Sequence, residues 1–348
     1  MRKAALRYLA RSSLAVLAAA AIALTPAIGN AAEKAAASGL RCSGVNMLPE
    51  LAATSPEVYS EIRSTADSTA NARAVLWKIE RQGVPHSYLL GTIHMTDPRV
   101  TAFSPLLQAA LAETETVALE VADVSADATN AAIAKAARLV LFTDGRTLDD
   151  LLSDEEYDKV KATLTGVGLP GEMAAMFRPW VVSMILSVSA CERQKVSDGL
   201  LVLDMKLANA ARERGIAVVG LETIESQLAA MAAVPDDQQI AMLRASLRFA
   251  DRANDTMETL LQLYLKRDMG SAWPFHLALA KQAGIGRQSF SEFKKRIISD
   301  RNETMRDAAL PLLREGRALI AVGALHLIGD QGLIALLREA GYTVTAVE

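Results

Sequence analysis

The chain has 348 residues, of which 51% are hydrophobic, and its formal net charge is −3. This length and apolar content can fill a substantial core in one large domain or in two ordinary ones. The small net charge gives no general attraction to nucleic acid or acidic lipid, so we expect no nucleic-acid partner. Composition alone therefore indicates a globular protein and leaves its chemistry and oligomeric state open.

The first residues differ from the rest of the chain. A basic segment, MRKAALRYLAR, precedes the apolar stretch SLAVLAAAAIALTPAIG, and the small residues of GNAA offer a cleavage site. This order is typical of a secretory signal peptide, here over residues 1–31, and the apolar stretch is short for a stable membrane span. We expect an exported protein, periplasmic or secreted, whose mature chain has no stable membrane span; an uncleaved anchor is the alternative.

The mature chain keeps two cysteines, Cys42 and Cys191. Two cysteines in an exported protein suggest one disulfide. Two separate buried thiols are the alternative, because the sequence does not show whether the residues meet.

The N-terminal part of the mature chain contains a short predicted helix near residues 56–66. AVLWKIERQGVPHSYLLGTIH then predicts two strands around a turn at Gln82–Gly83. Ser104 and Pro105 are a helix cap and a first helical residue, and apolar residues follow at helical spacing. TVALEV predicts a further strand that ends near Glu120.

The end of the chain repeats this plan. ALIAV predicts a strand, Asp330 is expected to cap the helix that follows, and YTVTAV predicts the last strand. Each copy therefore contains a strand, a Gly-x-x-His motif, a loop, a helix and a strand. A helix between two apolar strands favours a right-handed crossover and a parallel pair. We predict an α/β fold with a central, mostly parallel sheet built from both ends of the chain.

The middle of the chain, about 125–315, is expected to be a large helical insertion in a single domain spanning 32–348. LLVLDMKLANAARERG predicts an amphipathic helix that leads into the short strand IAVVGLE. The spacing of Ser289 and Glu292 is typical of a capping box at the start of the last long helix of the insertion.

Polar residues gather where this topology predicts a ligand site. Open α/β sheets bind ligands beyond the carboxyl ends of their strands, and both motif histidines, His94 and His326, follow predicted strands. Glu120 and Glu222 also stand at strand ends. Histidines and carboxylates placed together could bind a metal or transfer protons.

Two further charged residues share a helical face with apolar ones, Asp204 with Leu207 and Arg301 with Met305. Buried charges are costly unless they are paired or bind something. Each residue also has an ordinary structural explanation, since Asp204 and Arg301 could form an ion pair and Glu222 could cap a helix. The residue pattern alone leaves the catalytic and structural readings open.

The paired GTIH and GALH motifs, together with ALEV, RPW and RNETM, resemble the TraB/PrgY/GumN family. The bacterial GumN-like branch is most similar, through AVGALHLIGDQGLIALLREAGYTV. The family includes the Tiki proteins, which are divalent-metal proteases, so the resemblance implies a metal-dependent hydrolase. It implies ligands at His94, His326 and Glu120, and further functional positions at Asp204, Glu222, Arg301 and Asn302.

Our hypothesis is a hydrolase that uses a divalent metal, Mn²⁺, Co²⁺ or Zn²⁺, to cleave amide bonds of a peptide, protein or envelope component. Glu222 or Asp204 would act as general base or hold a histidine tautomer, and Arg301 would stabilise an oxyanion. Two alternatives stay open. One is a metal-free, esterase-like hydrolase, and the other is a binding or regulatory protein that uses the same cleft without turnover.

Overall fold

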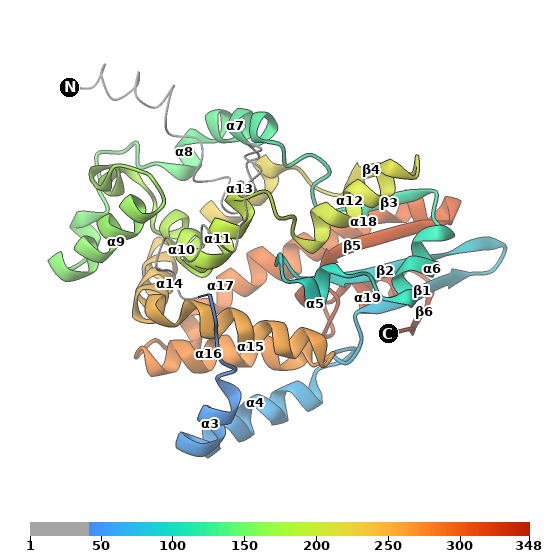
Figure 1. Cartoon of the computed structure of the whole chain (residues 1–348), viewed down its shortest axis with the longest axis horizontal. Helices are drawn as coiled ribbons and strands as arrows, with labels where there is room; N and C mark the ends of the chain where they lie inside the picture. The colour runs from blue at the N-terminus through green and yellow to red at the C-terminus, as the bar shows by residue number, and fades with distance from the viewer. Residues whose placement is uncertain (1–41) are drawn as a thin grey trace.

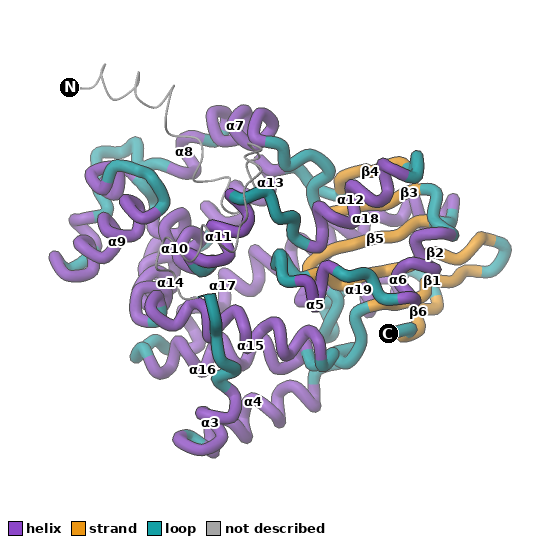
Figure 2. Tube along the Cα trace, in the orientation of Figure 1, coloured by secondary structure: helices purple, strands orange, loops and turns teal. Residues whose placement is uncertain are grey.

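The computed structural model describes residues 42–348, so the predicted signal peptide lies outside the described residues. In this range six strands form one sheet in the order β4-β3-β5-β2-β1-β6. Figures 1 and 2 show the sheet at one end of the molecule and the helices of the middle of the chain at the other. The strands are β1 (Leu76–Arg81), β2 (Val84–Thr92), β3 (Thr116–Leu119), β4 (Ala217–Gly220), β5 (Ala318–Gly323) and β6 (Thr343–Ala346).

Helices make up most of the remaining described chain. The α-helices are α3 (Leu48–Thr54), α4 (Pro56–Ser68), α5 (Pro98–Thr101), α6 (Pro105–Ala112), α7 (Ala126–Lys135), α8 (Ala137–Val140), α9 (Asp154–Gly166), α10 (Pro179–Ser187), α11 (Ala190–Ser197), α12 (Leu203–Glu213), α13 (Ile224–Ala232), α14 (Asp236–Arg248), α15 (Ala253–Leu265), α16 (Ala272–Gln282), α17 (Ser291–Lys294), α18 (Asp300–Glu315) and α19 (Leu333–Glu339). The shorter 3₁₀ turns are η2 (Asp149–Leu151), η3 (Gly171–Met176), η4 (Ala250–Arg252), η5 (Met269–Ser271), η6 (Arg287–Phe290) and η8 (Ala324–His326), and η7 (Lys295–Ser299) is a π-helix.

The sheet confirms the predicted fold class. β5 pairs in parallel with both β2 and β3, and β3 pairs in parallel with β4. β1 is antiparallel to β2 and to β6. The sheet is therefore mostly parallel. Its strands come from both ends of the chain, except for β4, which comes from the middle.

The predicted crossovers connect parallel strands. We expected the two strands of each crossover to pair with each other, but they are not neighbours in the sheet. β5 lies between β2 and β3, and β2 and β1 lie between β5 and β6. The two strand–helix–strand units are thus interleaved in one sheet. As a result β2 and β5, the strands that precede the two Gly-x-x-His motifs, lie side by side.

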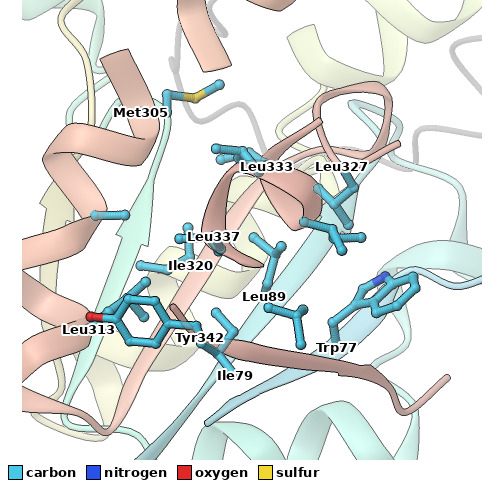
Figure 3. Packing of buried hydrophobic residues seen from close by; sticks show 14 of the residues in the cluster. Trp77, Ile79, Leu89, Met305, Leu313, Ile320, Leu327, Leu333, Leu337 and Tyr342 are labelled. Atoms are coloured by element: carbon cyan, nitrogen blue, oxygen red, sulfur yellow. The ribbon is translucent and has the colours of Figure 1, made fainter. Parts of the chain in front are cut away.

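Helices cover both faces of this sheet. Alternate residues of β5 point to opposite sides, so each set packs against a different pair of helices. Leu319 and Ala321 pack with α6 and α12 on one face. Ile320 and Val322 pack with α18 and α19 on the other. Figure 3 shows the second face, where Met305 and Leu313 of α18 and Leu333 and Leu337 of α19 lie against strand residues such as Ile79, Leu89 and Ile320.

Two predicted helix caps are wrong. Helix α19 begins at Leu333 after Gly332, and no side chain caps it, so Asp330 does not have the expected role. The segment near Ser289 starts as the 3₁₀ turn η6 and passes through α17 and the π-helix η7 before α18. The backbone N–H of Glu292 donates to Gln238 Oε1 instead of to a capping side chain. Tertiary contact from α14 thus replaces the local cap.

The middle of the chain has a hydrophobic cluster of its own, which includes Val160, Leu164, Trp180 and Leu243 from α9, α10 and α14. The segment between α12 and α13 returns to the sheet as its edge strand β4. Along residues 42–348 no helix combines the length and the apolar character that crossing a membrane requires.

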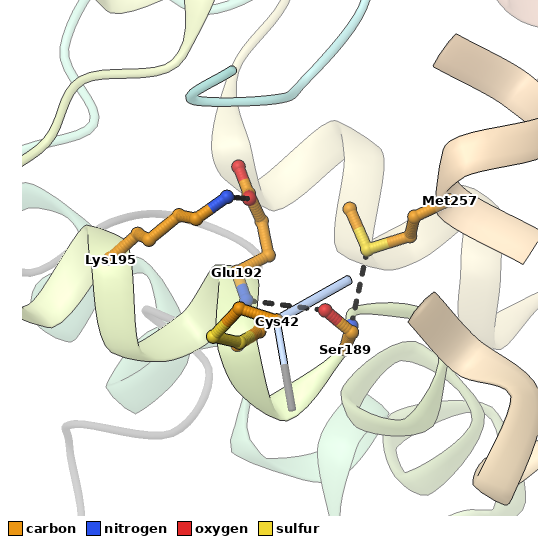
Figure 4. Close-up of a disulfide and its surroundings, with 6 residues drawn as sticks. Cys42, Ser189, Glu192, Lys195 and Met257 are labelled. Atoms are coloured by element: carbon orange, nitrogen blue, oxygen red, sulfur yellow. Dashed lines mark hydrogen bonds and ion pairs between the residues drawn. A yellow bond between two sulfur atoms is a disulfide. The ribbon is translucent and has the colours of Figure 1, made fainter. Parts of the chain in front are cut away.

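The predicted disulfide is present and joins Cys42 to Cys191, with Cα atoms 5.3 Å apart (Figure 4). It ties the N-terminal segment to the first turn of α11 across 149 residues of sequence. A disulfide is compatible with an exported protein, because such bonds persist in oxidising compartments.

Candidate functional site

The sheet brings the two Gly-x-x-His motifs together at the carboxyl ends of its parallel strands. Gly91 of β2 lies opposite Val322 of β5, and Thr92 lies opposite Gly323. β3 and β4 end on the same side, because they are parallel to β5. Glu120 is the first residue after β3, and Glu222 is the second residue after β4. Residues from four segments distant in sequence therefore meet beyond the carboxyl ends of the strands.

The glycine of each motif permits close packing at this edge. A Cβ atom on Gly91 would lie 3.0 Å from Cα and Cβ of Ala324 and from Leu327 Cδ2, so the first motif packs directly against the second. A Cβ on Gly323 would lie 3.3 Å from Glu120 Oε1 and 3.5 Å from His326 Cδ2. Larger side chains at these positions would separate the polar groups of the site.

Glu120 is the centre of the polar cluster, and its side chain is 13% exposed. Its Oε1 accepts the Gly323 N–H at 2.7 Å, and its Oε2 accepts from Arg301 Nη2 at 2.6 Å and from Gln227 Nε2 at 3.1 Å. Burial by itself raises the pKa of this carboxyl, but His326, Arg301 and the Gly323 amide hold the pKa of Glu120 well below its usual range. The carboxylate is therefore ionised in the folded protein.

Arg301 joins two buried carboxylates. Its Nη2 donates to Glu120 at 2.6 Å and to Glu222 at 2.7 Å, and its Nε donates to Glu222 Oε2 at 3.0 Å. Burial alone lowers the pKa of the guanidinium, but both carboxylates raise it, so Arg301 stays charged. The Glu222 side chain is 2% exposed and would be costly without this partner.

Hydrogen bonds fix the tautomer of His326. Asn302 is fully buried, and its Nδ2 donates to the Gln331 carbonyl at 2.7 Å, so its Oδ1 must face the His326 ring. His326 Nδ1 lies 2.7 Å from that oxygen and therefore carries the proton. Burial lowers the pKa of His326 to about 4, which leaves the imidazole neutral at pH 7. Its Nε2 then has a free lone pair and lies 3.8 Å from Glu120 Oε1.

His94 is bound in a similar way but lies open to solvent. Its Nδ1 contacts Asp204 Oδ2 at 2.8 Å, while its side chain is 63% exposed. Asp204 stands in the first turn of α12 and also accepts from the hydroxyl of Thr92. The attraction of Asp204 raises the pKa of His94 to about 9. The charge of His94 acts on both Glu120 and His326, which places all three in one electrostatic unit.

In the part of the chain that the structure describes, no three histidine, cysteine or acidic side chains are arranged as a ready metal cage. His326 and Glu120 are nevertheless near the span of two ligands on one ion, because bond lengths of about 2 Å place such ligands roughly 3–4 Å apart. His94 would have to supply the third ligand of such an ion.

Sequence reasoning missed three residues that support the site. Gln227 of α13 donates to both Glu120 and Glu222, at 3.1 and 3.4 Å. Tyr264 of α15 donates through its hydroxyl to the Gly91 carbonyl at 2.8 Å, and Thr92 donates to Asp204. Thr92 stands inside the first motif, which was a usable signal. Gln227 and Tyr264 lie on separate helices, and nothing in their local pattern indicates a partner.

The chain belongs to the TraB/PrgY/gumN family, whose pattern matches residues 75–346. It is 28% identical to Metalloprotease TIKI1 of Danio rerio, over 79% of this chain and 63% of that protein. It is 25% identical to the uncharacterized protein YbaP of Escherichia coli, over 74% of this chain and 89% of that protein. The chain thus spans less than two thirds of the TIKI1 relative. No solved structure matches it.

Gly91→Ala should destabilise the protein by about 1–3 kcal/mol, because the added methyl group overpacks the contact between the motifs. Urea unfolding at pH 7 measures the change. Gly166→Ala, at the end of α9, is the control, since a Cβ there meets nothing within 4 Å. Equal unfolding midpoints for the two variants would contradict the packing role of Gly91.

Arg301→Met should cost about 3–5 kcal/mol at pH 7, because it leaves two buried carboxylates without their cation. Lys159→Ala, which breaks the exposed pair with Glu155, should leave the free energy of unfolding nearly unchanged. Stability from Glu120 is present above its unfolded pKa and is lost as pH falls, so the gap between wild type and Arg301→Met should shrink in acid. A gap that stays constant as the pH falls below about 4.5, the pKa of an unfolded glutamate, would refute the assignment.

Proposed function

We propose that this protein is an exported, divalent-metal-dependent hydrolase that cleaves peptide bonds. One contact carries the proposal. The unprotonated Nε2 of His326 faces the ionised Oε1 of Glu120 across 3.8 Å, and both atoms are hydrogen-bond acceptors. Two acceptors at this distance gain nothing from each other, whereas a cation near both would bind to each lone pair.

The surrounding residues fit such a cation. Metal-binding histidines usually donate their other ring N–H to an oxygen, as His326 does to Asn302 and His94 can do to Asp204. Two imidazoles and one carboxylate form the donor set of many catalytic zinc sites, which keep a fourth position open. His94, His326 and Glu120 would therefore hold Mn²⁺, Co²⁺ or Zn²⁺, with Asp204 and Asn302 orienting the two rings.

A divalent cation at this position would supply an activated water and polarise a substrate carbonyl. The chain's own residues prepare the site. Arg301 keeps Glu120 ionised and fixed, Asp204 sets the tautomer of His94, and the exposed ring of His94 gives substrate access. Of the two carboxylates expected to serve as base or tautomer holder, Asp204 suits the second role. The base role of Glu222 and the oxyanion role of Arg301 stay predictions.

The relatives support the same reaction class. Several are named metalloproteases, including TIKI1 and TIKI2 proteins of vertebrates. We propose the same reaction class for this chain, which covers 60–63% of the length of these relatives. A peptide or protein in the exported compartment is the substrate class that follows, and the disulfide agrees with that compartment.

One observation favours a second candidate, a metal-free hydrolase. His94 and Asp204 form a solvent-accessible imidazole–carboxylate pair, which is the arrangement that activates a general base. Against it, a pKa of about 9 keeps His94 protonated at pH 7, where it could act as an acid but not as a base.

Purified protein should cleave members of a peptide library only with added Mn²⁺, Co²⁺ or Zn²⁺, and chelation should abolish the cleavage. His94→Ala, His326→Ala and Glu120→Gln should lose the activity, and Asp204→Asn should lose about 10–100-fold in metal affinity. His86→Ala is the matched control, because that histidine contacts Glu113 away from the site. Ester cleavage that survives chelation would favour the metal-free hydrolase. Peptide binding without any turnover would favour the binding protein.

Metal affinity should rise with pH, because a cation must displace the proton that Asp204 stabilises on His94. With the pKa of free His94 at about 9, displacement of one proton predicts an affinity gain of about tenfold per pH unit from pH 7 to 9. Calorimetric titration with Mn²⁺ in two buffers of different ionisation enthalpy measures both the affinity and the released proton. A flat affinity over this range would show that His94 is not a ligand.

A further inference from the structure

A buried carboxylate outside the cluster described above holds the loop that carries His94. The backbone N–H of Thr96, two residues after His94, donates to Glu192 Oε1. Glu192 is 6% exposed and stands in the first turn of α11, far from Thr96 in sequence. A buried carboxylate aimed at a backbone N–H is a strong, charge-assisted contact.

Helix α11 is itself anchored, so Glu192 offers a fixed acceptor. The residue before it, Cys191, forms the disulfide with Cys42, and the hydroxyl of Ser189 caps the helix by accepting the Glu192 N–H at 3.2 Å. Figure 4 shows Cys42, Ser189, Glu192 and Lys195 gathered at this helix start. Lys195 Nζ lies 3.4 Å from Glu192 Oε2 and supplies the neighbouring positive charge.

The His94 loop is thus held at three successive residues. The ring of His94 contacts Asp204, the Met95 carbonyl accepts the Leu203 N–H at 3.2 Å, and the Thr96 N–H contacts Glu192. The first two contacts both come from the start of α12. Only the third comes from α11, and it fixes the direction in which the chain leaves the site.

We infer that Glu192 is a positioning residue for His94, and that the disulfide-anchored start of α11 holds the loop in the geometry the site requires. The expected effect on metal affinity rests on the proposed function. The expected effect on the mobility of the His94 loop does not. His94 is open to solvent, and within residues 42–348 its ring has one hydrogen bond, to Asp204, so the position of the ring depends on the backbone of the loop.

Two substitutions separate positioning from general stability. Glu192→Ala removes the acceptor of the Thr96 N–H. Glu192→Gln keeps an acceptor oxygen of the same reach and removes only the charge. Ser153→Ala is the matched control, because it removes the equivalent serine cap of α9, which does not hold Glu192 or Thr96.

Hydrogen exchange measured by mass spectrometry on peptides covering 93–97 gives the direct readout. Glu192→Ala should raise amide exchange there by about tenfold or more, while peptides of β5 stay protected as in wild type. Glu192→Gln should restore most of the protection, and Ser153→Ala should leave it nearly unchanged. Affinity for Mn²⁺ should follow the same order, with a loss of about tenfold in Glu192→Ala.

Cys191→Ser provides an independent variant if Glu192→Ala does not fold. It frees the start of α11 while keeping the carboxylate, and it should raise exchange in 93–97 more than in β5. Loop exchange that is equal in wild type, Glu192→Ala and Cys191→Ser would overturn the inference. If the exchange differs as expected but no variant or wild type binds Mn²⁺, the positioning role stands and the proposed metal function fails.

Discussion

The guanidinium of Arg301 between Glu120 and Glu222 is the constraint on which the rest of the site depends. It joins the ends of β3 and β4 to the start of α18, across three segments of the chain. Neither carboxylate would be tolerated at its depth without this cation. Because Glu120 also accepts the Gly323 N–H, the same network reaches the end of β5 and so the second histidine motif.

Around this network the two histidines have opposite environments. His326 is buried and neutral, with a pKa of about 4, whereas His94 is exposed and charged, with a pKa of about 9. The Nδ1 atom of each ring contacts a side-chain oxygen, of Asp204 or of Asn302, which leaves Nε2 of each ring for a metal ion. The asymmetry suggests an order of binding. His326 and Glu120 would offer a divalent cation a ready lone pair, whereas His94 would first have to lose a proton.

The repeated Gly-x-x-His motif made the sheet and the position of the candidate site predictable from the sequence. Strand ends, apolar alternation and the disulfide were also readable, because they depend on local pattern or on compartment. The strand order was not predictable. Interleaving of the two units is decided by how α6, α12, α18 and α19 share the two faces, which is a property of the whole core.

The partners of the site residues were predictable only in part. Asp204 and Arg301 stood out as charges on apolar helical faces. The sequence left open that they form an ion pair with each other, but they contact other residues. Asp204 contacts His94, and Arg301 contacts Glu120 and Glu222. Gln227 and Glu192 gave no signal, because a polar residue on an ordinary helix is usually solvated and only the tertiary fold buries it.

The most direct test of the metal centre is a crystal structure of the protein grown with Mn²⁺, with anomalous scattering used to locate the ion. We expect one strong peak about 2 Å from Nε2 of both His94 and His326 and from a Glu120 oxygen, with the Asp204 and Asn302 contacts to Nδ1 retained. A peak elsewhere, or His326 and Glu120 without an ion between them at saturating Mn²⁺, would contradict the account.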